Sequence, residues 1–257
     1  MNPKHCAAIL AVMLTCAMAV SATAEQKSNK PPKGFTALFD GKDLNGWRGR
    51  QPNYNPLEEA KLTPEERAKK QAEWNAERDK HWRVDVAKGE IVSDGQSPHL
   101  ATGKDYGDFE FHVDWLMVSP NGDSGIYLRG YPQVQVWDPE NPREVKNGAP
   151  RGSGALWNDS AENPGKWPLV KADNPVGQWN SFKIKMIGER VWVSLNDKVT
   201  VDGQVLDNFF DKTQPIVTRG PIELQTHGSE IRFRNIYIRE IPAAEAKATL
   251  GKLPSKN

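Results

Sequence analysis

Cysteine is scarce in this sequence of 257 residues, and both cysteines, Cys6 and Cys16, lie close to the N-terminus. We predict below that residues 1–24 are removed, so the mature chain would contain no thiol. Disulfides then cannot stabilise the fold, and no cysteine can act as a nucleophile.

The sequence also lacks an apolar run of comfortable membrane-spanning length. The apolar segment of residues 7–20 follows a short basic start at Lys4 and precedes the small-x-small sequence of residues 22–24. This pattern predicts a secretory signal peptide over residues 1–24, with a secreted or periplasmic product and no membrane span. A lipoprotein modified at Cys16 is the second alternative, because the residues before this cysteine fit a lipobox poorly.

An excess of charge of either sign is missing as well. The chain has 34 basic and 33 acidic residues, and loss of Lys4 with the signal peptide leaves 33 of each. A net charge near zero argues against nucleic acid or an anionic membrane as a partner. The roughly 230 residues of a mature chain suffice for one all-β domain with a proper core.

Several motifs of catalysis and metal binding are absent from the sequence. It has no G-x-S-x-G motif, and the histidines beyond the signal peptide show neither H-x-x-x-H nor H-x-H spacing. Residues 121–125 (NGDSG) could hold calcium through their oxygens, but they are more simply a turn. We therefore predict no cofactor and no metal site, and a divalent metal is an alternative that the sequence does not support.

Alternating apolar and polar residues dominate the sequence from His81 onward. In residues 108–118 (DFEFHVDWLMV), bulky apolar side chains alternate with Glu110, His112 and Asp114. Similar segments follow, separated by turns rich in Gly, Asn, Asp and Pro. Strands of this length and spacing predict an all-β protein, an antiparallel sandwich or jelly roll.

Three segments interrupt this pattern. Residues 25–33 read as a polar linker. Residues 58–80 predict an inserted surface helix without a catalytic role, because the capping box of Thr63 and Glu66 is followed by almost no apolar stripe. Residues 139–178 form a long loop rich in Pro, Gly and Asn, and its tryptophans favour a packed, functional loop over a disordered one.

The strand pattern also predicts which polar residues face outward. If the apolar residues of each strand point into the core, the residues between them share the other face. The outward candidates are Glu110, His112, Asp114, Tyr127, Arg129, Gln133, Gln135, Trp137, Glu223, Gln225 and His227. A face that is merely solvated is the alternative, because antiparallel sheets commonly expose one polar face to water.

The candidates differ in how well a solvated face explains them. For Glu110, His112 and Asp114 the solvated-face and the functional interpretations hold equally. For Arg129 we favour a role in binding. The structural alternative is an ion pair with Asp114 or Glu110. The paired amides of Gln133 and Gln135 suit a ligand rich in hydroxyl groups.

Two candidates lie near loops. His227 ends a strand beside Gly228, where loops form clefts, so we favour a functional role for this histidine. Trp157 in the long loop is predicted to be a platform for a ligand, whereas Trp47, Trp82, Trp115 and Trp179 are predicted to lie in the core.

Eight segments, taken in order, resemble one known family. They are FTALFDGKDLNGW, GDFEFHVDW, DSGIYLRG, PQVQVWD, GSGALWND, VGQWNSFKIKM, RVWVSLND, and GPIELQTHG with the later IRFRNIYIRE. This order is typical of the 3-keto-disaccharide hydrolase domain, and the resemblance covers residues 34–241, which leaves residues 242–257 as a C-terminal tail. It implies a concanavalin A-like jelly-roll sandwich in a secreted or periplasmic protein that acts on sugars oxidised at C3. The chain departs from the family by the insertion of residues 58–80 and by Gln133, where many members have Glu, so we do not assign the base to Gln133.

The resemblance also implies a reaction. The ketone of a 3-keto sugar acidifies the hydrogen at C2, so a base can form an enolate that expels the C1 substituent, after which water adds back. We assign acid–base chemistry to His227, since the unperturbed pKa of imidazole is about 6.5, and stabilisation of the oxyanion to Arg129. Asp114 is the alternative base. The contacts with the small carbohydrate substrate are assigned to Glu110, Tyr127, Gln133, Gln135, Trp157 and Gln225.

Two other functions are compatible with the same residues. A non-catalytic, lectin-like module would use the same face without needing an acid–base group. A partner-binding domain would use the inserted helix of residues 58–80 as its contact surface.

Overall fold

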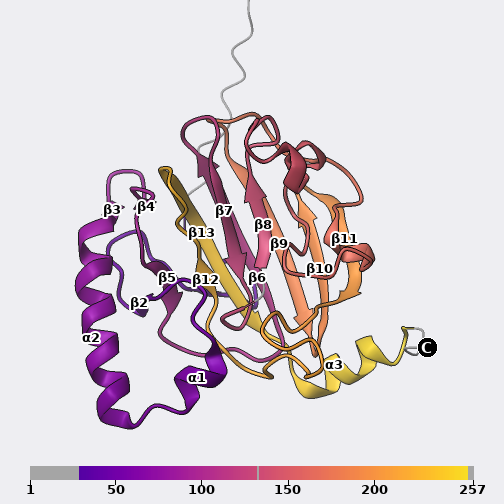
Figure 1. The fold of residues 1–257 in the computed structure, drawn as a ribbon, viewed down its shortest axis with the longest axis horizontal. Helices are drawn as coiled ribbons and strands as arrows, with labels where there is room; N and C mark the ends of the chain where they lie inside the picture. The colour runs from indigo at the N-terminus through magenta and orange to yellow at the C-terminus, as the bar shows by residue number, and fades with distance from the viewer. Residues whose placement is uncertain (1–28, 132, 254–257) are drawn as a thin grey trace, which may run out of the picture.

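The computed structural model describes residues 29–131 and 133–253, and its strands form two antiparallel sheets that pack face to face (Figure 1). The larger sheet has eight strands and the smaller sheet five. The prediction of an all-β jelly-roll sandwich is thereby confirmed. The predicted signal peptide, residues 1–24, lies outside the described residues.

The larger sheet has the strand order β11–β10–β9–β6–β13–β4–β3, and β1 also pairs with β13. Its strands are β1 (Thr36–Ala37), β3 (Trp82–Asp85), β4 (Glu90–Ser93), β6 (Phe109–Met117), β9 (Asn180–Ile187), β10 (Arg190–Leu195), β11 (Lys198–Val205) and β13 (Ile231–Glu240). The smaller sheet has the order β2–β5–β12–β7–β8. Its strands are β2 (Trp47–Arg50), β5 (His99–Thr102), β7 (Asp123–Tyr127), β8 (Gln133–Trp137) and β12 (Glu223–Leu224).

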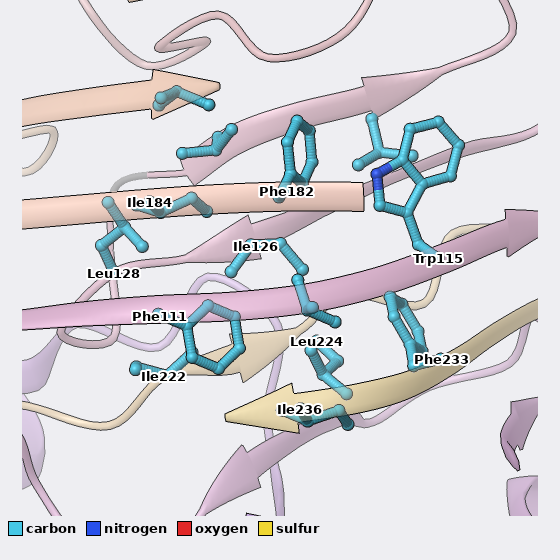
Figure 2. Close-up of a cluster of buried hydrophobic side chains, with 14 of the residues drawn as sticks. Phe111, Trp115, Ile126, Leu128, Phe182, Ile184, Ile222, Leu224, Phe233 and Ile236 are labelled. Atoms are coloured by element: carbon cyan, nitrogen blue, oxygen red, sulfur yellow. The ribbon is translucent and has the colours of Figure 1, made fainter. Parts of the chain in front are cut away.

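The core fills the space between the two sheets. Along β6 every second residue is buried, as the alternation predicts, and Phe111 and Trp115 point inward from this strand. They meet Ile126 and Leu224 from the smaller sheet (Figure 2). Burial of such a side chain contributes roughly 1.5–3 kcal/mol to the stability of the fold. The apolar face of each strand therefore points toward the core.

The inserted segment forms two helices, α1 (Pro56–Ala60) and α2 (Pro64–His81), that lie beside strand β2 (Figure 1). Helix α2 begins with the predicted capping box, in which Thr63 and Glu66 bond each other's backbone N–H groups. A single surface helix was expected, and the structure corrects this expectation, because residues 61–63 separate α1 from α2.

Side chains of α2 replace a neighbouring strand at the β2 edge of the smaller sheet. The Gly49 N–H donates to Asn75 Oδ1 over 2.9 Å, and Gln71 Nε2 donates to the Gly49 carbonyl over 2.9 Å. A Cβ atom at Gly49 would lie 2.1 Å from the Trp74 carbonyl oxygen, so only glycine allows this approach. An uncovered edge strand presents unpaired backbone groups to other chains, and the helix removes that hazard.

The long loop of residues 139–178 is packed against the edge strand β8, as predicted. The loop contains three 3-10 turns, η1 (Val145–Asn147), η2 (Ala149–Arg151) and η3 (Pro164–Lys166). It then returns antiparallel along β8, where the Gln135 N–H donates to the Ala155 carbonyl over 2.9 Å and the Gly154 N–H donates to the Gln135 carbonyl over 2.8 Å. The loop therefore extends the smaller sheet by one irregular strand.

The C-terminal segment contains helix α3 (Ala243–Leu250). Its Ala246 packs with Ile187 and Ile241, and its Glu245 pairs with Arg239 at 2.7 Å. Across the described part of the chain, none of the helices has the length and apolar character that crossing a membrane requires.

Candidate active site

Four of the predicted site residues meet on the outward face of the smaller sheet. In the strand register, Glu223 of β12 lies opposite Tyr127 of β7, and Tyr127 lies opposite Gln133 of β8. One pair further along, Gln135 lies opposite Gly125, whose carbonyl accepts the Gln225 N–H over 2.9 Å. We call Tyr127, Gln133, Gln135 and Gln225 the glutamine face.

Hydrogen bonds join the side chains of the glutamine face. Gln133 Nε2 donates to Gln135 Oε1, and Gln225 Nε2 donates to the Tyr127 hydroxyl over 3.2 Å. Gly125 leaves room for them, because a Cβ atom there would lie 2.9 Å from Gln225 Oε1 and 3.1 Å from the amide of Gln133. Gln225 Oε1 is buried and has no hydrogen-bond partner among the described residues, which is uncommon for a buried acceptor.

His227 lies at one end of this face and is held by a carboxylate. Its Nδ1 lies 3.0 Å from Asp123 Oδ2, and the other oxygen of Asp123 accepts Gln135 Nε2 over 2.8 Å. The hydrogen bond to Asp123 raises the pKa of His227 above its ordinary value, against partial burial, and the charges of Asp123 and Glu144 add to the rise. This pairing orients the imidazole and leaves Nε2 available for proton transfer.

A small hollow opens at His227. It has a volume of about 240 Å³, and its lining is formed by Asn121, Asp123, Asn141, Arg143, Glu144, His227 and Gly228. The His227 side chain is 62% exposed, whereas Tyr127, Gln133 and Gln135 of the glutamine face are buried and Gln225 is half-buried. The hollow gives a ligand access to the imidazole and to Asp123, whereas the amides of the glutamine face are not among the residues that line it.

Asp123 was not predicted as a site residue. Its segment, residues 121–125, was interpreted as a turn, but Asp123 is the first residue of β7. Extending the alternation backward from Tyr127 through Gly125 would have placed Asp123 on the same face, so the information was present in the sequence.

Trp157 lies at the edge of the glutamine face. The backbone N–H of Trp157 donates to the Gln133 carbonyl over 3.2 Å. Its indole ring makes an edge contact with the Trp137 ring, with 5.3 Å between the ring centroids. Lys166 Nζ lies 4.0 Å from the centre of the same ring. The structure therefore brings Trp157 to the candidate site, and its role as a platform for a sugar stays a prediction.

Arg129 does not join this site, which corrects the prediction. The residue has a left-handed backbone with φ of 54°, so the alternation that predicts an outward side chain ends before it. Its guanidinium is 2% exposed and bonds three carbonyl groups, those of Gly107, Gly188 and Val217. It also pairs with Asp108 at 3.0 Å rather than with either of the expected carboxylates. Arg129 holds loops together and is not available to an oxyanion on the glutamine face.

Glu110 and Asp114 also lie elsewhere. Both are on the outward face of the larger sheet, because β6 belongs to that sheet, and the core separates them from the glutamine face. Glu110 pairs with Arg239 at 3.1 Å, and Asp114 accepts Asn235 Nδ2 over 2.7 Å. The prediction that they share a site with His227 is wrong, and the solvated-face alternative describes them better.

A buried charge network below Tyr127 was missed. Glu223 Oε1 lies 2.6 Å from Arg50 Nη1, and Glu223 Oε2 lies 3.3 Å from His99 Nδ1. The His99 ring stacks on Tyr127 at 5.1 Å, and Tyr131 stacks on Tyr127 at 4.9 Å. Arg50 and Glu223 are each 1% exposed, and burial at this depth requires that charges be paired.

The two tyrosines keep their protons at neutral pH. Burial raises the pKa of Tyr127 far above its ordinary value. Burial also raises the pKa of Tyr131 to about 12. Both phenols can therefore act as neutral hydrogen-bond donors.

The described residues contain no group of three or more His, Cys, Asp or Glu side chains arranged to hold a metal ion. The site as built offers the exposed pair of His227 with Asp123, neutral amide and phenol donors, and an aromatic edge. Such a combination can bind a polyhydroxylated ligand and move a proton on it.

Comparison with known proteins places the chain in a family. A family model for the 3-keto-alpha-glucoside-1,2-lyase-like domain matches residues 34–239. A 3-keto-disaccharide hydrolase of Bacteroides thetaiotaomicron is 23% identical over 254 residues, which cover 80% of this chain and 78% of the relative.

Two solved structures from Parabacteroides distasonis, both named only provisionally as glycosyl hydrolases, have the same fold. The first is 25% identical with a TM-score of 0.58 and covers 84% of this chain and 100% of its own. The second is 23% identical with a TM-score of 0.54, over 80% and 99% of the two chains. These relationships support a carbohydrate-active function. The resemblance predicted from the sequence is confirmed, and the chain belongs to the 3-keto-alpha-glucoside-1,2-lyase-like domain family.

Proposed function

We propose that the protein is a glycosidase-type enzyme that cleaves 3-keto-glycosides by elimination at C2 and C1 followed by hydration. The observation that supports this most strongly is the pair of His227 and Asp123 beside the glutamine face. Family membership and the name of the relative from Bacteroides thetaiotaomicron favour the same substrate class.

The first step of the proposed reaction is removal of the C2 proton. His227 Nε2 takes this proton, and the electrons of the C2–H bond form an enolate with the C3 ketone. Asp123 keeps the Nδ1 proton in place and stabilises the imidazolium that results. Since Arg129 is engaged elsewhere, neutral donors such as the Tyr127 hydroxyl and the amide N–H groups take over the stabilisation of the enolate oxygen.

The second step breaks the bond between C1 and the leaving oxygen. The enolate electrons form a C1–C2 double bond, and the imidazolium returns its proton to the departing alcohol. Water then adds to C1, and C2 regains a proton, so the net change is hydrolysis. Gln225 Oε1, which has no partner among the described residues, would accept a sugar hydroxyl, and Trp157 would contact the sugar ring.

We also propose that the protein acts after export, since residues 1–24 have the pattern of a signal peptide. A secreted or periplasmic location would expose the enzyme to glycosides from outside the cell.

Sugar binding without turnover is the second candidate function. It is favoured by Gln133, a neutral amide at a position where many relatives are expected to have a carboxylate. Its pairing with Gln135 places two amides at the centre of the face, and amides can form hydrogen bonds with sugar hydroxyl groups.

The test is release of nitrophenol from a nitrophenyl β-glucoside and from its 3-keto counterpart, each with and without a chelator. We expect release from the keto substrate and a loss of at least about 100-fold in His227→Ala. His81→Ala is the matched control, because His81 forms a similar pair with Asp94 at 2.9 Å on the surface. If the wild type binds sugar but releases nitrophenol from neither substrate, the proposed enzymatic function is wrong and the lectin-like module is supported.

A further inference from the structure

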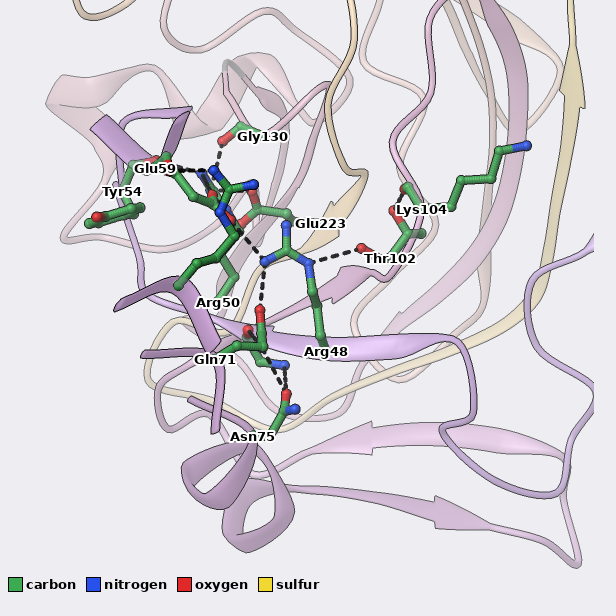
Figure 3. Close-up of polar contacts among 12 residues, drawn as sticks. Arg48, Arg50, Tyr54, Glu59, Gln71, Asn75, Thr102, Lys104, Gly130 and Glu223 are labelled. Atoms are coloured by element: carbon green, nitrogen blue, oxygen red, sulfur yellow. Dashed lines mark hydrogen bonds and ion pairs between the residues drawn. The ribbon is translucent and has the colours of Figure 1, made fainter. Parts of the chain in front are cut away.

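Helix α1 of the insertion contacts two charged side chains of the smaller sheet. Helix α1 places the Glu59 carboxylate 3.0 Å from Arg50 and 3.1 Å from Arg48, both on β2 (Figure 3). Burial opposes the charged form of Glu59, but Arg50 and Arg48 prevail and hold its pKa below the ordinary value. Glu59 is therefore ionised at neutral pH and serves as a partner of Arg50.

Arg50 lies between two carboxylates that come from different parts of the fold. Its Nε donates to Glu59 Oε2 over 3.0 Å, and its Nη1 donates to Glu223 Oε1 over 2.6 Å. The carbonyl of Tyr54, in the turn before α1, accepts Nη2 over 2.8 Å. Burial opposes the charged guanidinium, but Glu223 and Glu59 together raise the pKa of Arg50. The insertion thus supplies one of the two carboxylates that keep this buried charge in place.

The second carboxylate belongs to the strand of the candidate site. Glu223 is two residues before Gln225 on the same face of the smaller sheet. Its other oxygen contacts His99, whose ring stacks on Tyr127, and the Tyr127 hydroxyl accepts the amide of Gln225. A continuous chain of contacts therefore runs from α1 to the glutamine face.

We infer that the inserted helices position the glutamine face, with Glu59 acting through Arg50 on Glu223 and His99 and so on the Gln225 amide. Glu59 and Arg50 are positioning residues in this arrangement, since neither touches the proposed substrate. The inference rests on the proposed function and adds to it a role for a segment that the sequence marked only as a surface insertion.

Edge protection alone would not explain Glu59. The contacts that cover the edge of β2 come from α2 and are directed at backbone groups, as for Gln71 and Asn75 on Gly49. Glu59 instead bonds charged side chains, one of which is buried and directed toward the site. A helix that only covered an edge would not need to pair with Arg50, which already forms an ion pair with Glu223.

The test compares Glu59→Gln with Glu58→Gln. Glu58 is the next residue in α1, but its carboxylate is exposed and pairs with Lys61 at 2.5 Å on the surface. We measure kcat and KM on the 3-keto glucoside, the melting temperature, and the affinity for a glucoside by calorimetry. We expect Glu59→Gln to lower kcat/KM about ten-fold at temperatures where the variant is fully folded, and Glu58→Gln to leave it unchanged.

A purely structural role would give a different result. In that case Glu59→Gln would lower the melting temperature while kcat/KM and sugar affinity per folded molecule stayed at wild-type values, and the inference would be overturned. Glu59→Asp is the second variant, to be used if Glu59→Gln does not fold. It keeps the charge but withdraws the carboxylate by one methylene, and a smaller loss of kcat/KM is expected from it.

The binding measurement separates this inference from the proposed reaction. If the wild type binds the glucoside without cleaving either substrate, the proposed reaction fails, and an affinity about ten-fold lower in Glu59→Gln would still support positioning by the insertion. Equal affinities of the wild type and Glu59→Gln would overturn it.

Discussion

His227 and Asp123 show how one carboxylate can give an exposed histidine a defined chemical role. Asp123 accepts from Nδ1, which selects the tautomer with a basic Nε2, and it favours the protonated ring. The same carboxylate also bonds Gln135, so the position of the imidazole is tied to the glutamine face. The geometry therefore links the proposed base to the groups that would hold the sugar.

Asp123→Asn tests this link through the pH dependence of the reaction. The proposed base must be neutral, so kcat/KM should rise with pH through the pKa of His227, which Asp123 raises above its ordinary value. Removing the negative charge should move this rise to lower pH and reduce the plateau by roughly 10- to 100-fold, because an amide no longer enforces the tautomer. The pH–rate profile of the keto substrate is the measurement, with Asp94→Asn beside His81 as the control. A rise at unchanged pH would remove Asp123 from the mechanism.

At the level of elements, helix α2 acts as a substitute for a strand. It runs beside β2 and supplies amide side chains where a neighbouring strand would supply backbone groups. Its own sequence has little apolar character, so its attachment depends on these polar contacts and on the close approach at Gly49. The long loop protects the opposite edge by pairing with β8, so both edges of the smaller sheet are covered.

Asn75→Ala tests the covering of the edge. The Gly49 N–H would lose its acceptor, and we expect the free energy of unfolding to fall by about 1–2 kcal/mol. Glu73→Ala, on the exposed side of α2, should change it by less than about 0.5 kcal/mol. Chemical denaturation of both variants is the measurement, and equal stabilities would mean that the side chain of Asn75 does not support the edge.

At the level of the whole molecule, the two outward faces of the sandwich are separate. The larger sheet exposes ion pairs such as Glu110 with Arg239, and the smaller sheet carries the glutamine face. Between them lies an apolar core, so we expect a change of charge on the side of Glu110 to have little effect on the glutamine face.

Glu110→Gln tests this separation. The carboxylate of Glu110 is partly exposed, so loss of its pair with Arg239 should cost less than about 1 kcal/mol of stability. We expect kcat/KM on the keto substrate to equal that of the wild type, in contrast to His227→Ala. A loss of turnover without a loss of stability would show that the two faces communicate.

Much of the fold could be predicted from the sequence. The alternation of β6 placed Phe111 and Trp115 in the core, and the capping box marked the start of α2. The same alternation, applied to β7 and β8, grouped Tyr127 with Gln133 and Gln135, because strands joined by a short turn pair in a register that local sequence determines.

The composition of the site depended on the tertiary structure. Alternation within a strand says which residues share one face of that strand, but the assignment of β6 to the other sheet moved Glu110 and Asp114 away from His227. A left-handed backbone at Arg129 redirected a side chain that the pattern placed outward. Arg50 and Glu223 are 173 residues apart in the chain, so their pairing follows only from the packing of distant strands and the insertion. The strands and their apolar faces could thus be predicted from the order of the residues, because these features depend on neighbours in the chain. Which polar faces meet became known from the folded molecule, because that depends on how distant segments pair and pack.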